Sequence, residues 1–99
     1  IHDDIDLPLG KIKIVQNRGS AGHKGVESII KAVGNKNLVR IRVGIQPAKG
    51  KPKNAQTFVV KNFEKEEERL LKKTIEKVFQ AILTIENEGL DKAMNEYNS

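Results

Sequence analysis

The sequence predicts an α/β fold in which a twisted mixed β-sheet is flanked by helices. Residues 11–14 and 38–45 alternate polar and apolar side chains with the period of two that is typical of half-buried strands. A glycine-rich loop and a helical pattern lie between them, and an apolar stripe at helical spacing runs through the last third. Because a helix between strands favours a crossover connection, these patterns together indicate layers of sheet and helix.

The first strand is expected over residues 1–7. It should end in a turn at Pro8 and Gly10, because proline cannot donate in a ladder and glycine adopts unusual dihedral angles. The next strand follows at once, with two lysines on one face and two isoleucines on the other. This short connection predicts that the two strands are hairpin-like neighbours.

A glycine-rich loop over residues 19–25 leads into a short helix from Val26 to Val33, which Gly34 should end. The N–H groups at the start of such a helix can bind an anion. The glycine spacing matches neither the dinucleotide fingerprint nor a Walker loop, so a tight turn that requires small residues is the alternative interpretation.

The strand at 38–45 carries Arg40 and Arg42 side by side on its polar face. Residues 46–56 are predicted to form an exposed loop before a short strand at Thr57–Val60. A long loop of this kind often has a function.

The last third is predicted to be helical. A helix from about Lys65 to Asn87 should bury an apolar stripe that includes Ile75 and Phe79. Gly89 suits a left-handed cap, after which a second short helix should run from Leu90 to Tyr97. We expect one partial domain over residues 1–99, with 64–99 as its C-terminal helical segment.

The net charge of +5 is unevenly distributed. Residues 1–61 carry twelve Lys or Arg and four carboxylates, a charge of +8, whereas residues 62–99 carry −3. A basic surface attracts polyphosphate partners, and the alternative interpretation of the same charge is a lysine-rich surface that serves solubility alone. The chain has no cysteine and no long apolar run, which fits a cytoplasmic protein without a membrane segment.

The side chains that could carry chemistry are few. The two histidines, His2 and His23, lack the spacing of a zinc site, and no serine, cysteine or threonine stands next to an evident base. The acidic cluster near the start could suggest a divalent cation. Asp3, close to the strand's end, is better placed to orient a histidine, as a triad carboxylate does. No metal or cofactor is expected.

Four stretches, in order and with matching spacing, resemble blocks of the bacterial peptidyl-tRNA hydrolase family. They are HDDIDLPLGK at 2–11, GSAGHKGVESI at 19–29, RIRVGI at 40–45 and EGLDKAMN at 88–95. The resemblance implies a single, longer α/β domain, of which this chain matches the C-terminal half. It also implies a monomeric, cofactor-free hydrolase that cleaves the ester between a peptide and the 3′ ribose of tRNA.

The same resemblance implies roles for individual residues. Asp3 aligns with the aspartate that orients a general-base histidine, and that histidine belongs to the family's N-terminal half, outside this chain. The isolated chain should therefore be inactive. The glycine loop implies substrate binding at Gly22, His23 and Lys24, although the family usually has asparagine where Lys24 stands.

The residues expected to bind the tRNA acceptor-stem phosphates are Lys11, Lys13, Arg40 and Arg42. Arg42 matches one member of the family's basic clamp for the 5′ phosphate, while Val15 takes the place of its lysine partner and Lys13 is the nearest cation. Two alternatives stay open. One is a tRNA- or ribosome-binding module without catalysis, and the other is a mononucleotide pocket at the glycine loop.

Overall fold

The computed structural model describes residues 1–35, 37–54 and 63–98. Three strands form one mixed sheet: β1 (His2–Pro8), β2 (Ile12–Gln16) and β3 (Val39–Gln46). Three helices accompany it: α1 (Lys24–Val33), α2 (Lys65–Glu88) and α3 (Leu90–Tyr97). The predicted α/β class is confirmed, and the predicted strand at Thr57–Val60 lies outside the described residues.

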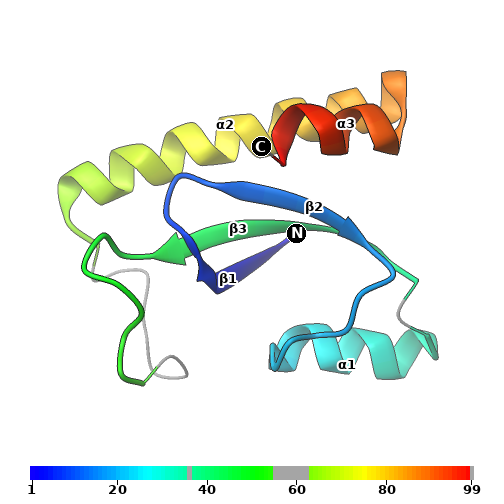
Figure 1. The fold of residues 1–99 in the computed structure, drawn as a ribbon, viewed down its shortest axis with the longest axis horizontal. Helices are drawn as coiled ribbons and strands as arrows, with labels where there is room; N and C mark the ends of the chain where they lie inside the picture. Colours follow the sequence, from blue (N-terminus) through cyan, green and yellow to red (C-terminus); the bar gives the residue numbers. More distant parts are fainter. Residues whose placement is uncertain (36, 55–62, 99) are drawn as a thin grey trace.

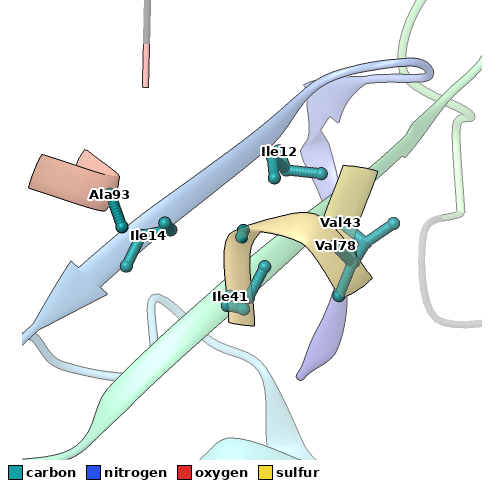
Figure 2. Packing of buried hydrophobic residues seen from close by; sticks show 7 residues of the cluster. Ile12, Ile14, Ile41, Val43, Val78 and Ala93 are labelled. Carbon is teal, nitrogen blue, oxygen red and sulfur yellow. The ribbon is translucent and has the colours of Figure 1, made fainter. Parts of the chain in front are cut away.

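Figure 1 shows that α2 and α3 lie along one side of the sheet, whereas α1 lies on the other side. Isoleucine and valine side chains of β2 and β3 meet α2 at Val78 and Ala81 and α3 at Ala93 (Figure 2). This core explains why the alternating and helical patterns were visible in the sequence: each element has one apolar face, and the layers bury those faces together.

The strand order is β1-β3-β2, so the expected hairpin between β1 and β2 is wrong. β3 lies between them, parallel to β1 and antiparallel to β2. The connection from Pro8 to Lys11 crosses directly over Gly44 of β3, where an added Cβ would overlap the carbonyl oxygen of Pro8. The short connection is possible because Gly44 has no side chain.

Helix α2 buries only part of the predicted stripe: Val78 lies in the core and Leu71, Ile82 and Ile85 pack against it. Its buried residues are Thr74, Val78 and Ala81, while Ile75 is 56% exposed and Phe79 is 60% exposed. The expectation that Ile75 and Phe79 are buried is therefore wrong. Hydropathy alone favoured these large apolar residues, but the close approach to the sheet selects the small side chains at 74 and 81.

The caps of the helices differ in type. Gly34 ends α1 with a left-handed conformation, φ 89° and ψ 0°, as expected. Gly89 has φ 95° but ψ 163°, which is not the predicted left-handed cap. It ends α2 and begins α3 at the same time, because its N–H donates to Ile85 and its carbonyl accepts from Ala93. The chain must turn there within a single residue, which favours glycine.

Candidate active site

The loop after β2, the start of α1 and the edge strand β1 surround an open cavity of about 750 Å³. All three residues of the predicted substrate loop, Gly22, His23 and Lys24, line this cavity together with Asp3. Residues that are 20 positions apart in the sequence are thus brought to one place, as the predicted site requires.

His23 links α1 to β1. Its Nδ1 accepts a hydrogen bond from the Val26 N–H at 3.2 Å, which makes it the N-cap of α1. Its Nε2 lies 2.9 Å from Asp3 Oδ1. Since a backbone N–H can only donate, Nδ1 must be the acceptor, and the ring proton is at Nε2, where it is donated to Asp3.

His2 has the opposite tautomer. Its Nε2 lies 3.2 Å from the Arg40 Nη1, which can only donate, so Nε2 accepts and Nδ1–H donates to the Asp3 carbonyl at 2.7 Å. Burial lowers the pKa of His2 below its usual 6.5, and the nearby His23 and Arg40 act in the same direction. Both polar atoms of this ring are therefore engaged inside the protein.

Neither imidazole offers a free lone pair to a water molecule in the cavity. The acceptor nitrogen of His23 is engaged by Val26 and that of His2 by Arg40. Asp3 differs, because its side chain is 58% exposed and Oδ2 has no partner among the residues that the structure describes. One carboxylate oxygen is held in place and the other is open, an arrangement that can orient a further imidazole.

Arg40 is buried, although the sequence places it beside Arg42 on the polar face of the strand. It is only 8% exposed. Its Nη2 donates to the carbonyls of Arg18 and Gly19, at 3.3 and 2.8 Å. Burial lowers the pKa of Arg40, with Arg42 next in effect, but a guanidinium stays charged in proteins. Arg40 is buried because the loop after β2 folds over it and supplies two carbonyls.

Arg42 is more accessible and forms an ion pair with Asp4, through Nε and Oδ2. Lys13 lies directly opposite Arg42 on β2, whereas the buried Val15 lies opposite Arg40. Lys11 is exposed just before β2. The structure thus places Lys13 and Arg42 side by side on neighbouring strands.

The three aspartates near the start of the chain each contact a different basic side chain. Asp3 pairs with His23, Asp4 with Arg42, and Asp6 with Lys51 at 2.7 Å. In the described ranges, no group of three His, Cys, Asp or Glu residues is arranged to hold a metal ion. Among the same residues no helix is long and apolar enough to cross a membrane.

Sequence reasoning missed Arg18 and Lys51, which both line the cavity. Arg18 follows the alternating strand by two residues, and no local pattern indicates where its side chain lies. Lys51 belongs to the loop after β3 that was predicted to be exposed. The only available signal for Lys51 was the length and charge of that loop.

The model of the family described as peptidyl-tRNA hydrolase matches residues 1–99. The chain belongs to the peptidyl-tRNA hydrolase family. A peptidyl-tRNA hydrolase of Thermodesulfovibrio yellowstonii is 45% identical, over 99% of this chain and 51% of that protein. One from Fervidobacterium nodosum is 50% identical, over all of this chain and 54% of that protein. The resemblance found in the sequence is confirmed.

Solved structures of peptidyl-tRNA hydrolases have the same fold in the matching region. The crystal structure of the enzyme from Acinetobacter baumannii has a TM-score of 0.83 and 25% sequence identity, over 99% of this chain and 49% of that chain. The chain spans about half the length of the peptidyl-tRNA hydrolases that it matches.

Proposed function

We propose that this chain forms the substrate-holding part of a peptidyl-tRNA hydrolase, which hydrolyses the ester between the peptide and the 3′ ribose of tRNA. The observation that carries the proposal is Asp3 in the wall of the cavity, with Oδ1 fixed by His23 and Oδ2 open. Membership of the family supports the substrate. A monomer in the cytoplasm, without a cofactor, belongs to the same proposal.

In the proposed mechanism, Asp3 Oδ2 accepts a hydrogen bond from a histidine outside this chain. That bond holds the imidazole with its other nitrogen toward a water molecule, which it deprotonates for attack on the ester carbonyl. The bond between the carbonyl carbon and the 3′ oxygen then breaks, and the imidazolium returns the proton to that departing oxygen. His23 keeps the Asp3 carboxylate in position, since its own acceptor nitrogen is engaged by Val26. The Lys24 ammonium at the cavity would favour negative charge that develops on the ester oxygen.

The tRNA would be held mainly through phosphates. Lys11, Lys13 and Arg42 supply the accessible charge on β2 and β3 in this proposal. Arg40 contributes indirectly, because it fixes the loop that leads to His23. Gly22, His23 and Lys24 would contact the peptide end of the substrate.

The decisive test is hydrolysis of a labelled peptidyl-tRNA under single-turnover conditions, with the chain in excess. We expect no release of peptide by the chain alone, with tRNA still bound. Addition of the N-terminal half of the Thermodesulfovibrio relative should restore hydrolysis. Peptide release by the chain alone would contradict the proposal that the general base lies outside this chain. The variants His2→Gln and His23→Gln would then show which imidazole acts as the base.

Asp3→Asn tests the role of the carboxylate in the restored enzyme. Turnover should fall by roughly 10²-fold or more while tRNA affinity changes little, because the side chain orients the base and not the substrate. Asp91→Asn, on an exposed position of α3, is the matched control and should leave both unchanged. Equal losses of rate and affinity in Asp3→Asn would exclude the positioning role.

A non-catalytic tRNA- or ribosome-binding module is the second candidate. It is favoured because the acceptor nitrogens of His23 and His2 are occupied by Val26 and Arg40, so neither ring can accept a proton from water. The Lys24 ammonium, where the family usually has asparagine, favours it as well. If this candidate is correct, Arg42→Gln lowers the affinity for tRNA and the dependence of binding on salt. Addition of the N-terminal half of the Thermodesulfovibrio relative then restores no turnover.

A further inference from the structure

Two cavities of this chain share one wall. The larger cavity contains Asp3 and the glycine loop, and a smaller one of about 210 Å³ lies between β2 and α3, beside Lys13. Arg18 and Arg42 line both cavities. A ligand that extends from one cavity to the other must therefore pass these two guanidinium groups.

The backbone at Arg18 is held firmly although its side chain is exposed. β2 ends at Gln16, and Asn17 then adopts φ 60°, which redirects the chain. The N–H of Asn17 donates to the Leu38 carbonyl at 3.4 Å, and Arg40 binds the carbonyls of Arg18 and Gly19. The loop thus presents the Arg18 side chain from a fixed base.

Arg18 and Arg42 differ in their partners. The charge of Arg42 is balanced by Asp4. The Arg18 guanidinium has no hydrogen bond or ion pair with any side chain in the described parts of the molecule, and Lys24 in the same cavity also lacks one. An exposed, uncompensated guanidinium on a fixed loop is suited to bidentate binding of a phosphate.

The lining of the two cavities favours the nucleic acid backbone over its bases. Neither lining includes phenylalanine, tyrosine or tryptophan, the large aromatic side chains on which unpaired bases most often stack. The cations of the same region lie in the part of the chain that carries +8. Recognition through phosphates fits both facts.

We propose that Arg18 binds a backbone phosphate in the single-stranded 3′ segment of the tRNA. The phosphate lies where the RNA passes from the smaller cavity, beside Lys13, into the larger cavity, which contains Asp3. This inference rests on the proposed function and assigns a residue and a ligand group within it. Arg18 is a substrate-binding residue in this account, and Arg40 positions it through the two loop carbonyls.

The test compares two RNA hairpins that differ only in their 3′ end. One carries a short single-stranded 3′ extension and the other is blunt, and both are titrated with the chain by fluorescence anisotropy at several salt concentrations. Arg18→Gln should weaken binding of the extended hairpin roughly fivefold to tenfold and lower its salt slope by roughly 0.7, as expected for one lost single-strand phosphate contact. Binding of the blunt hairpin should not change.

Two further variants complete the design. Arg18→Lys keeps the charge but not the bidentate fork, so it should keep the salt slope while it recovers only part of the affinity for the extended hairpin. Arg69→Gln removes an arginine from an exposed position of α2 that lines neither cavity, and it should affect neither hairpin. Circular dichroism of each variant checks that the fold is intact.

The outcomes separate this inference from the proposed function. If the unaltered chain binds both hairpins and Arg18→Gln weakens neither, or weakens both equally, the role of Arg18 is refuted while RNA binding stands. If the unaltered chain binds neither hairpin, the proposed function and the role of Arg18 fail together.

Discussion

The two histidines lie with their ring centroids 4.7 Å apart, yet their partners give them opposite tautomers. His23 accepts at Nδ1 because it caps a helix, and His2 accepts at Nε2 because it faces Arg40. Each ring is thus a structural bridge between elements. At the scale of single residues, the partners of a histidine and not its presence in a cavity decide whether it can act as a base.

The lowered pKa of His2 predicts a pH-dependent stability. The folded state binds this proton more weakly than the unfolded state, so the free energy of unfolding should fall as the pH falls below about 6.5 and level off below the folded pKa. Protonation also turns the contact with Arg40 into a repulsion. Urea unfolding of the chain and of His2→Asn, from about pH 7.5 to about pH 5, isolates the effect.

The difference between the two proteins measures the contribution of His2, since every other side chain is the same in both. His2→Asn keeps a side-chain acceptor and should show a flatter profile in this range. Parallel profiles would mean that His2 is protonated equally in the folded and unfolded states.

At the scale of elements, the crossing of the β1–β2 connection over β3 depends on one missing side chain. Gly44→Ala places a methyl group against the Pro8 carbonyl, and relief requires movement of the backbone. We expect a loss of roughly 3 kcal/mol or more in the free energy of unfolding, measured by urea denaturation. Gly19→Ala meets open space and should change stability by less than about 0.5 kcal/mol.

The outer edge of β2 is closed by a side chain. Asn98, just after α3, accepts from the Ile14 N–H at 2.7 Å and donates to the Ile14 carbonyl at 2.9 Å. It thus occupies the edge much as another strand would. No further strand pairs with this edge in the described ranges. This pairing attaches the C-terminal helix to the sheet and protects backbone groups that could pair with another chain.

Asn98→Ala removes both hydrogen bonds of the edge. Stability should fall by about 1–3 kcal/mol, and hydrogen exchange of the Ile14 amide should accelerate more than that of its neighbours in β2. Asn95→Ala, an exposed position of the same helix, is the control. Unchanged exchange at Ile14 would show that the pairing does not persist in solution.

At the scale of the whole molecule, apolar side chains remain uncovered on both sides of the sheet. Ile29 and Val33 of α1 are 54% and 52% exposed, and Ile75 and Phe79 of α2 are exposed to a similar degree. The burial stripe predicted for α2 was therefore broader than the surface that this chain covers. Exposed groups of this kind mark surfaces that can be buried by another part of a protein.

Two neighbouring positions of α2 test this description. Val78→Ala removes a side chain that is 6% exposed and should cost about 1–3 kcal/mol, because it opens a void against β2 and β3. Phe79→Ala alters an exposed side chain and should stay within about 0.5 kcal/mol. Both values follow from urea unfolding. A loss at Phe79 as large as that at Val78 would show that this face is covered in solution.

The sequence by itself determined the elements and their order. Alternation predicted β2 and β3, helical spacing predicted α2 and α3, and the glycine loop predicted the start of α1, because each pattern depends on side chains close in the chain. The four family blocks also predicted roles for Asp3, His23 and Lys24. These statements need only local periodicity or residue identity.

Only the tertiary structure decided the order of strands, the buried state of Arg40 and the partners of the histidines. Arg40 contacts residues 21 and 22 positions away, and Asn98 pairs with a residue 84 positions away. Such contacts form between segments whose spacing in the chain carries no periodic signal. Which face is buried, and which charged group is compensated there, depends on what the folded chain brings opposite it.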